Sequence, residues 1–239
     1  METTVVALPE PGRYERIASP IHTLIVLVAL AAWTVWGKFQ ADEMRAAASP
    51  DKIGLYARTF VFEWLLFAVA LAGVWRHGSP LSSVLGDRWK SLHQVLIDIG
   101  IAAAFWLCSG FLLFLLSKLL RTEGLGKNMQ FMLPHGRLQI AMWIALSITA
   151  GICEEAIFRG YFQRQFISFT KNAPAGIALS AAAFGAAHAY QGLRMVVLIA
   201  LYGSMFGILA HWRKTVRPGM IAHAWQDTLG GIAASVMRH

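Results

Sequence analysis

The stretch LQIAMWIALSITAGICEEAIF, residues 138–158, decides the fold class of this chain. Its apolar run is long enough to cross the hydrocarbon core of a bilayer, which takes about 20 residues as a helix. Near the end of the run stand two adjacent carboxylates, Glu154 and Glu155. Because a charged side chain inside a bilayer is costly, these residues are candidates for a functional site. The stretch therefore predicts both a membrane helix and the place of its chemistry.

Six further apolar segments are separated by short polar, Gly-containing or Pro-containing stretches. They are Pro20–Gly37, Thr59–Trp75, Val95–Leu116, Ala173–Ala189, Met195–Trp212 and Met220–Met237. We expect all seven segments to be helices, because a helix satisfies its own backbone polar groups inside lipid. The prediction is an all-α, polytopic membrane helix bundle with about seven transmembrane helices, or eight if a hidden half-span exists.

We expect the chain to form one membrane domain. Residues 1–19 are predicted to be an N-terminal tail, residues 20–137 to hold the first three membrane helices, and residues 138–239 to hold the last four with the candidate site. The longest interruptions carry most of the charge and are expected to be surface loops or interfacial helices: Lys38–Arg58, Arg76–Gln94 and Ser117–Arg137. Residues 38–58 are expected to be a loop in the polar phase.

The composition excludes a water-soluble enzyme. Hydrophobic residues make up 56% of the 239 residues and charged residues only 14%, against roughly 25% charged in soluble domains. The formal net charge is +8, but the basic residues are spread thinly between apolar runs. We therefore expect the lipid bilayer, and not a nucleic acid, to be the partner of this charge, and we expect an integral multi-pass membrane protein.

Three polar residues stand alone within or near the first three apolar segments: His22, Glu63 and Asp98. We interpret them as interhelical hydrogen-bonding groups or as residues near the lipid headgroups. The two cysteines, Cys108 and Cys153, lie in apolar runs and are interpreted as small buried hydrophobic residues.

The two adjacent glutamates cannot face the same environment, because successive residues on a helix point about 100° apart. Glu155 and Arg159 have the i, i+4 spacing and order that favour an ion pair. Glu155 is therefore predicted to be structural. Glu154 points elsewhere and is free to face a cavity as a general base.

Two later segments carry residue pairs with the same spacing: Phe184 with His188, and His223 with Asp227. Each pair lies on one helix face. A lone histidine on an apolar helix is usually a hydrogen-bonded core residue. Three helices that carry a glutamate, a histidine and a His/Asp pair instead favour a polar pocket that can hold water.

Together the motifs Glu-Glu-x-x-x-Arg (154–159), Phe-x-x-x-His (184–188) and His-x-x-x-Asp (223–227) resemble the CAAX prenyl protease and bacteriocin-processing family of intramembrane glutamate proteases. The resemblance covers about residues 138–237 and includes Phe-Arg-Gly-Tyr-Phe (158–162). It implies an endopeptidase that hydrolyses a peptide bond of a membrane-anchored or prenylated protein, or of a leader peptide, without a covalent intermediate.

The resemblance also implies roles for the site residues. Glu154, assisted by His188, takes a proton from water, and His223 donates to the tetrahedral oxyanion. Phe184 either shapes the pocket wall or packs the helices. The family's last motif often ends in Asn; Asp227 departs from it, and an ionised carboxylate only accepts hydrogen bonds. Asp227 is then expected to orient His223 or to stay protonated.

Three alternatives remain open from the residues. Zinc is one, because His188, His223, Glu154 and Asp227 form a plausible ligand set, although no His-Glu-x-x-His run is present. A thiol mechanism through Cys153 is another. The third is a non-enzymatic immunity or chaperone factor that binds a partner in the same pocket. We expect no cofactor.

Overall fold

Every regular element in the described chain is a helix. The computed structural model describes residues 15–122 and 125–236. The predicted apolar segments lie in the long helices α1 Pro20–Ala46, α2 Lys52–Arg76, α4 Leu92–Leu119, α5 Gly136–Glu154, α7 Ala173–Ala187, α8 Leu193–Arg213 and α9 Arg217–Val236. Shorter elements join them: α3 Ser82–Leu85, η1 Leu125–Met132, the π-helix η2 Glu155–Phe162, α6 Gln163–Thr170 and η3 Ala189–Gln191. The all-α bundle is confirmed; residues 1–14 of the expected tail, and Met237, lie outside the described residues.

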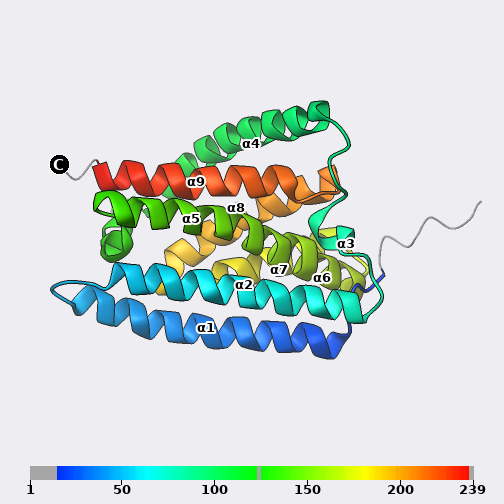
Figure 1. Ribbon diagram of the computed structural model, residues 1–239, viewed down its shortest axis with the longest axis horizontal. Coiled ribbons are helices and arrows are strands. Elements are labelled where there is room, and N and C mark those ends of the chain that lie inside the picture. Colours follow the sequence, from blue (N-terminus) through cyan, green and yellow to red (C-terminus); the bar gives the residue numbers. More distant parts are fainter. Residues whose placement is uncertain (1–14, 123–124, 237–239) are drawn as a thin grey trace, which may run out of the picture.

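Helix α5 lies in the middle of the bundle, between α2 and α9 (Figure 1). α1 packs along α2, α4 covers α9 at the opposite edge, and α7 pairs with α8. The helix directions bring the starts of α1, α4 and α9 together with the ends of α2, α6 and α8. These six helix termini form one end of the bundle, at the right of Figure 1.

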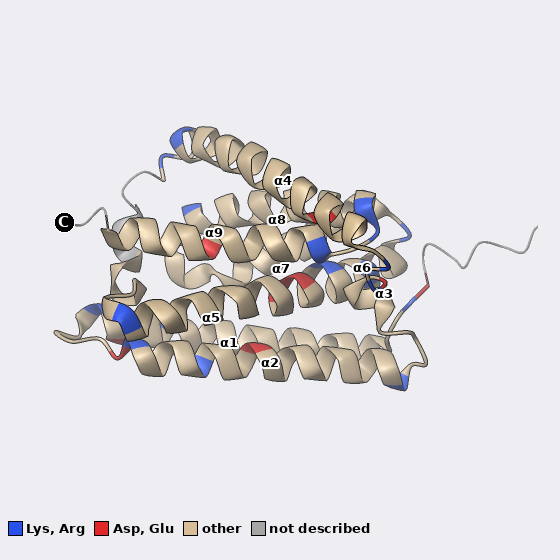
Figure 2. Cartoon of the chain, turned by 45° about the horizontal axis from the view of Figure 1, so that its top comes forward, with Lys and Arg blue, Asp and Glu red and all other residues tan. Residues whose placement is uncertain are grey.

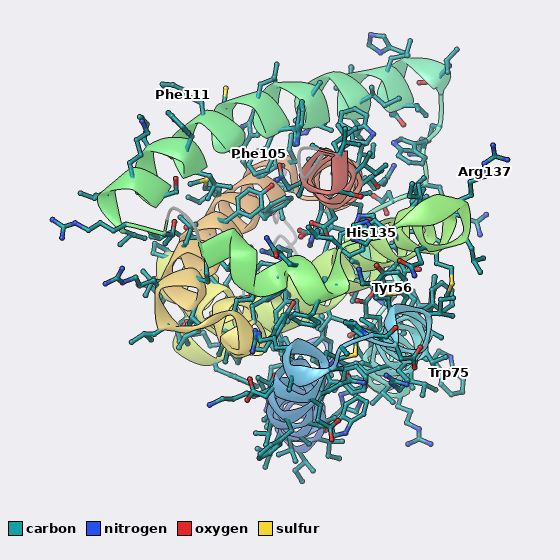
Figure 3. All side chains as sticks on the ribbon, turned by 90° about the vertical axis from the view of Figure 1, so that its left-hand side faces the viewer. Tyr56, Trp75, Phe105, Phe111, His135 and Arg137 are labelled. Carbon is teal, nitrogen blue, oxygen red and sulfur yellow. The ribbon has the colours of Figure 1, made fainter. Side chains whose placement is uncertain are left out.

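The outer faces of the helices carry large apolar side chains. On α4, Phe105 points into the bundle, where its ring centroid lies 4.8 Å from that of Phe206, whereas Phe111 points outward and is 65% exposed (Figure 3). Trp75 also points outward from α2 and is 72% exposed. An apolar surface of this extent faces lipid, as the composition predicted.

In the part of the chain that the structure describes, five helical segments are long and apolar enough to cross a membrane: α1, α2, α4, the continuous segment Gly136–Thr170, and α8. Helix α7 has 15 residues and a length of about 22 Å, less than the hydrocarbon thickness. Helix α9 also falls outside this set, so five of the expected seven segments qualify by these measures. The chain is an integral, multi-pass membrane protein.

The helix that contains residues 138–158 is longer than predicted. We expected the apolar helix to end near Phe158, with the two glutamates at its end, but α5, η2 and α6 form one helical segment over Gly136–Thr170. Several polar side chains beyond Phe158 find partners inside the protein, which lets the helix continue: Gln165, for example, accepts from the backbone N–H of Ile17 at 2.9 Å. The glutamates therefore lie in the middle of a membrane-length helix, where it changes from α to π geometry, a change that often marks a functional site.

The prediction of a loop at residues 38–58 is wrong. Helix α1 continues to Ala46 and α2 begins at Lys52, so only residues 47–51 connect them. The extension is stabilised because Ala41 and Met44 pack against Phe131 of η1. Asp51 then starts the next helix by accepting from the Gly54 N–H at 2.9 Å.

Two of the lone polar residues make the expected contacts. The Tyr161 hydroxyl lies 2.6 Å from His22 Nδ1, and His22 Nε2 donates to the carbonyl of Val69 at 3.0 Å. Asp98 lies in the second turn of α4 and accepts from Trp89 Nε1 at 2.8 Å. The expectation for the cysteines holds only for Cys153, because Cys108 is exposed on the outer face of α4.

Candidate active site

The ion pair between Glu155 and Arg159 lies at the centre of the site. Arg159 Nη1 donates to Glu155 Oε1 at 2.8 Å, and both side chains are 1% exposed. Arg159 also donates to the carbonyl of Gly203 on α8 at 3.2 Å, and its guanidinium lies 4.2 Å from the ring centroid of Phe184. The predicted pair is therefore present, and it joins η2 to α7 and α8.

Glu155 has a second contact that the sequence did not reveal. Its Oε1 atom lies 3.0 Å from Nδ1 of His223 on α9. A carboxylate paired with arginine accepts hydrogen bonds, so Nδ1 is the donor. The other ring nitrogen, Nε2, then faces Glu154 Oε2 at 3.7 Å and Asp227 Oδ2 at 3.5 Å. Glu155 thus fixes the orientation of the imidazole that we expected Asp227 to orient.

His188 lies directly after the last residue of α7, not within the helix as expected. Its Nδ1 donates to the carbonyl of Phe184 at 2.9 Å, because a carbonyl oxygen only accepts. In the neutral ring this bond leaves Nε2 as an acceptor for water or a proton. The Phe184 ring centroid lies 4.8 Å from that of His188 and 6.1 Å from that of His223, so Phe184 packs near both imidazoles.

A cavity of about 140 Å³ opens onto this group. Glu154 and His188 line it, and Tyr190 of η3 lies beside them. The volume holds several waters, each of which needs about 10–15 Å³. Burial raises the pKa of Tyr190 to about 12, so its phenol keeps its proton at neutral pH. His223 and Asp227 do not line the cavity; they approach Glu154 from α9.

Glu63 is the residue that sequence reasoning placed wrongly. It lies in the middle of α2, is 8% exposed, and lines the same cavity as Glu154. Its Oε2 atom has no hydrogen-bond partner in the described chain. We expected an interhelical hydrogen bond or a position near the headgroups; instead the carboxyl group opens onto the cavity. A carboxylate at mid-span with no basic residue four positions away was the available signal.

The structure places the residues of the two alternative chemistries, zinc and a thiol, as follows. Within residues 15–122 and 125–236, no three His, Cys, Asp or Glu side chains are grouped so as to hold a metal ion. Nδ1 of His223 is already bonded to Glu155. Cys153 is fully buried and packs within the apolar core with Ala156 and Ile157. Glu63, Glu154 and His188 line the cavity and are candidates for its chemistry.

The fold and this site define a polytopic membrane protein with ionisable side chains gathered inside its helix bundle. Residues 136–229 match the family described as Rce1-like, type II CAAX prenyl endopeptidase Rce1-like, and the chain carries an Rce1-like domain over these residues. This match confirms the family resemblance, implies a membrane protease, and contains all seven site residues predicted from the motifs. Helices α1, α2 and α4 lie outside it. No curated protein and no solved structure matches the chain.

Proposed function

We propose that this protein is an intramembrane endopeptidase that hydrolyses a peptide bond with water activated by Glu154 and His188. The observation that carries the proposal is that both side chains line one cavity within the bundle. Glu154 Oε2 has no hydrogen-bond partner in the described chain, and Nε2 of neutral His188 is an acceptor. A water between them has two groups able to take its proton.

The positions of these groups support the following reaction. Glu154 takes a proton from the water as the oxygen attacks the scissile carbonyl carbon, and the carbonyl electron pair moves onto its oxygen. His223 donates from Nε2 to that oxyanion. The tetrahedral intermediate then collapses, the C–N bond breaks, and Glu154 returns the proton to the leaving amine. No covalent enzyme intermediate forms.

The charge around His223 supports its role as the donor. Its Nδ1 is bonded to Glu155, and its Nε2 lies near the carboxylates of Glu154 and Asp227. Three carboxylates stabilise an imidazolium that donates from both nitrogens. Asp227 is then a local acceptor for Nε2–H before the substrate carbonyl arrives, which agrees with a carboxylate at this position.

The apolar wall of the cavity favours a substrate that is itself in the membrane. Trp33 of α1 and Phe62 of α2 line it and stack with ring centroids 3.8 Å apart. Leu66 and Phe131 add further apolar surface. This wall suits a membrane-anchored or prenylated protein, or a leader peptide, whose scissile bond enters from the lipid side.

Mass spectrometry of membrane peptides from cells with the wild-type protein and with Glu154→Gln tests the proposal. We expect cleavage products that disappear with Glu154→Gln and persist with Glu43→Gln, which makes the same chemical change at an exposed position of α1. Products that persist in both variants would overturn the proposal. A cellular phenotype that survives Glu154→Gln would favour a binding factor.

A further inference from the structure

A second cavity, of about 340 Å³, lies at the end of the bundle where α4 begins, α8 ends and α9 begins. It shares no lining residue with the first cavity. Figure 2 shows basic segments of the chain gathered at this end. Gly86, whose φ is +80°, brings the loop before α4 so close to Thr215 that a side chain at this position would overlap it. The loop and the α8–α9 turn therefore form a packed site.

The charge of this cavity is strongly positive. Its ionisable lining residues are Asp87, Arg88, Lys90, Asp98, Arg213, Lys214 and Arg217, which is five cations against two carboxylates. Asp98 is already used, since it accepts from Trp89 and, at 3.2 Å, from Arg213. Arg88, Lys90 and Lys214 make no ion pair in the described chain. The excess positive charge calls for an anion.

Two of the cations show a missing hydrogen-bond partner and a fixed position, respectively. The Arg213 Nε atom is buried and has no hydrogen-bond partner among the described residues. The Arg217 guanidinium lies 4.8 Å from the ring centroid of Trp89, so its position is fixed by the aromatic face. Arg217 is also the first residue of α9, where the helix dipole adds positive potential.

The position of the cavity along the membrane normal indicates which anions can reach it. Two candidate membrane spans end here, α4 at Leu92 and α8 at Arg213. Trp89 and Trp212 beside them are 44% and 66% exposed, and exposed tryptophans are typical of the membrane–water interface. The cations therefore lie at the level of the lipid headgroups, where basic pockets between helices bind phosphates.

We propose that this cavity binds a phosphate group, carried by an anionic phospholipid headgroup or free in solution, through Arg213, Lys214 and Arg217. Arginine suits phosphate because its planar fork donates two parallel hydrogen bonds. Arg88 and Lys90 add attraction from the loop side. The proposal is independent of the proteolytic site.

The full-length protein with Lys214→Gln and Arg217→Gln combined tests the proposal, and a second variant, Arg88→Gln, leaves the contact with Trp89 intact. The matched control combines Arg16→Gln with Arg76→Gln, which removes two charges at the same end of the bundle outside the cavity. Thermal unfolding and retained lipid, read by native mass spectrometry, are compared in nanodiscs of phosphatidylcholine with and without phosphatidylglycerol. Inorganic phosphate is titrated in detergent against sodium chloride of equal ionic strength.

We expect phosphatidylglycerol to raise the unfolding temperature of the wild type and the control. The paired variant should bind at least about tenfold more weakly, and Arg88→Gln should be intermediate, because charge-assisted hydrogen bonds are lost. If inorganic phosphate stabilises the wild type but not the paired variant, the site binds free phosphate as well. Stabilisation by the lipid alone assigns it to the headgroup. Stabilisation that is absent, or that the paired variant retains, overturns the proposal.

Discussion

Two groups of ionisable side chains lie side by side within the bundle. One group lines the first cavity, whereas the other is bonded together. The closed cluster is Glu155, Arg159 and His223, which bond to one another at 2.8 and 3.0 Å. The open cluster is Glu63, Glu154 and His188, which lines the first cavity. One carboxylate oxygen of each glutamate in the open cluster lacks a hydrogen-bond partner within the described chain.

The difference teaches that residue type alone does not assign a role at this depth. Both clusters contain a glutamate and a histidine, and Glu154 and Glu155 are neighbours in the sequence. Glu155 also has one oxygen without a hydrogen-bond partner in the described chain, but Glu155 does not line the first cavity, whereas Glu63 and Glu154 do. We infer that Glu155 and Arg159 hold the helices together and fix His223, which presents Nε2 to the oxyanion, and that the open cluster activates the water.

The largest effect is expected from Glu155→Ala. This change leaves Arg159 buried without its carboxylate and removes the acceptor for His223. Breaking a buried ion pair costs about 3–5 kcal/mol of unfolding free energy, so the variant should be both destabilised and inactive. Thermal unfolding in detergent measures the first effect.

The control for this prediction is Asp42→Ala. Asp42 pairs with Arg45 at 2.8 Å, but its side chain is 59% exposed, and exposed pairs contribute about 0–1 kcal/mol. A drop in unfolding temperature after Glu154→Gln as large as that after Glu155→Ala would contradict the division into closed and open clusters.

The next effect, Glu154→Gln, should act on catalysis alone. Loss of a general base lowers the rate by about 10²–10⁴-fold, whereas the amide keeps the shape of the side chain and should leave the unfolding temperature near that of the wild type. A rate assay with a substrate identified by mass spectrometry measures the change. Full activity in this variant would mean that another residue is the general base.

A smaller effect is expected from Glu63→Gln. The change should lower kcat by about tenfold with little change in KM, because one acceptor for cavity water is replaced. Stability should stay equal or rise, since a buried carboxyl group without a partner is costly. Unchanged kcat together with a lower unfolding temperature would instead assign Glu63 a structural role.

The same comparison shows how far the sequence could predict the site. The Glu155–Arg159 pair follows from helical spacing, and so does the face of α9 that carries His223 and Asp227. These are local geometries that hold wherever the helix lies. The bond between Glu155 and His223 joins residues 68 positions apart, and it depends on how closely α9 packs against α5 and η2. Spacing within one helix contains no such information.

For the fold as well, the sequence predicts what is local to one helix and misses what depends on packing between helices. Apolar runs predicted the helices, because burying backbone groups in lipid requires them. The stretch at the end of α1 was predicted to be a loop because it is a charged interruption between apolar runs, yet Met44 packs against Phe131. Glu63 was misplaced for a related reason: a single carboxylate on an apolar helix does not indicate which neighbouring helix brings a cavity beside it.

The smallest effect should come from Asp227→Asn and from removal of metal ions. Glu155 already fixes His223 through Nδ1, so the loss of charge at Asp227, 3.5 Å from Nε2, should change kcat/KM by less than about tenfold. The amide can also donate to the oxyanion, where a carboxylate cannot. Purified enzyme should keep its activity after chelation and dialysis, because Glu154 and His188 supply the base.

A zinc mechanism gives the opposite results. If Asp227 were a ligand together with His188 and His223, Asp227→Asn would weaken binding of the ion, and chelation would abolish an activity that zinc restores. Binding of zinc by His223 would also compete with the bond between Nδ1 and Glu155 or use the Nε2 that faces Glu154, so the metal-loaded and metal-free proteins would differ in thermal stability. An inactive Asp227→Asn enzyme together with zinc-restored activity would assign His188, His223 and Asp227 to metal binding. Retained activity in both tests would leave Asp227 as a local acceptor beside an imidazole that Glu155 holds in place.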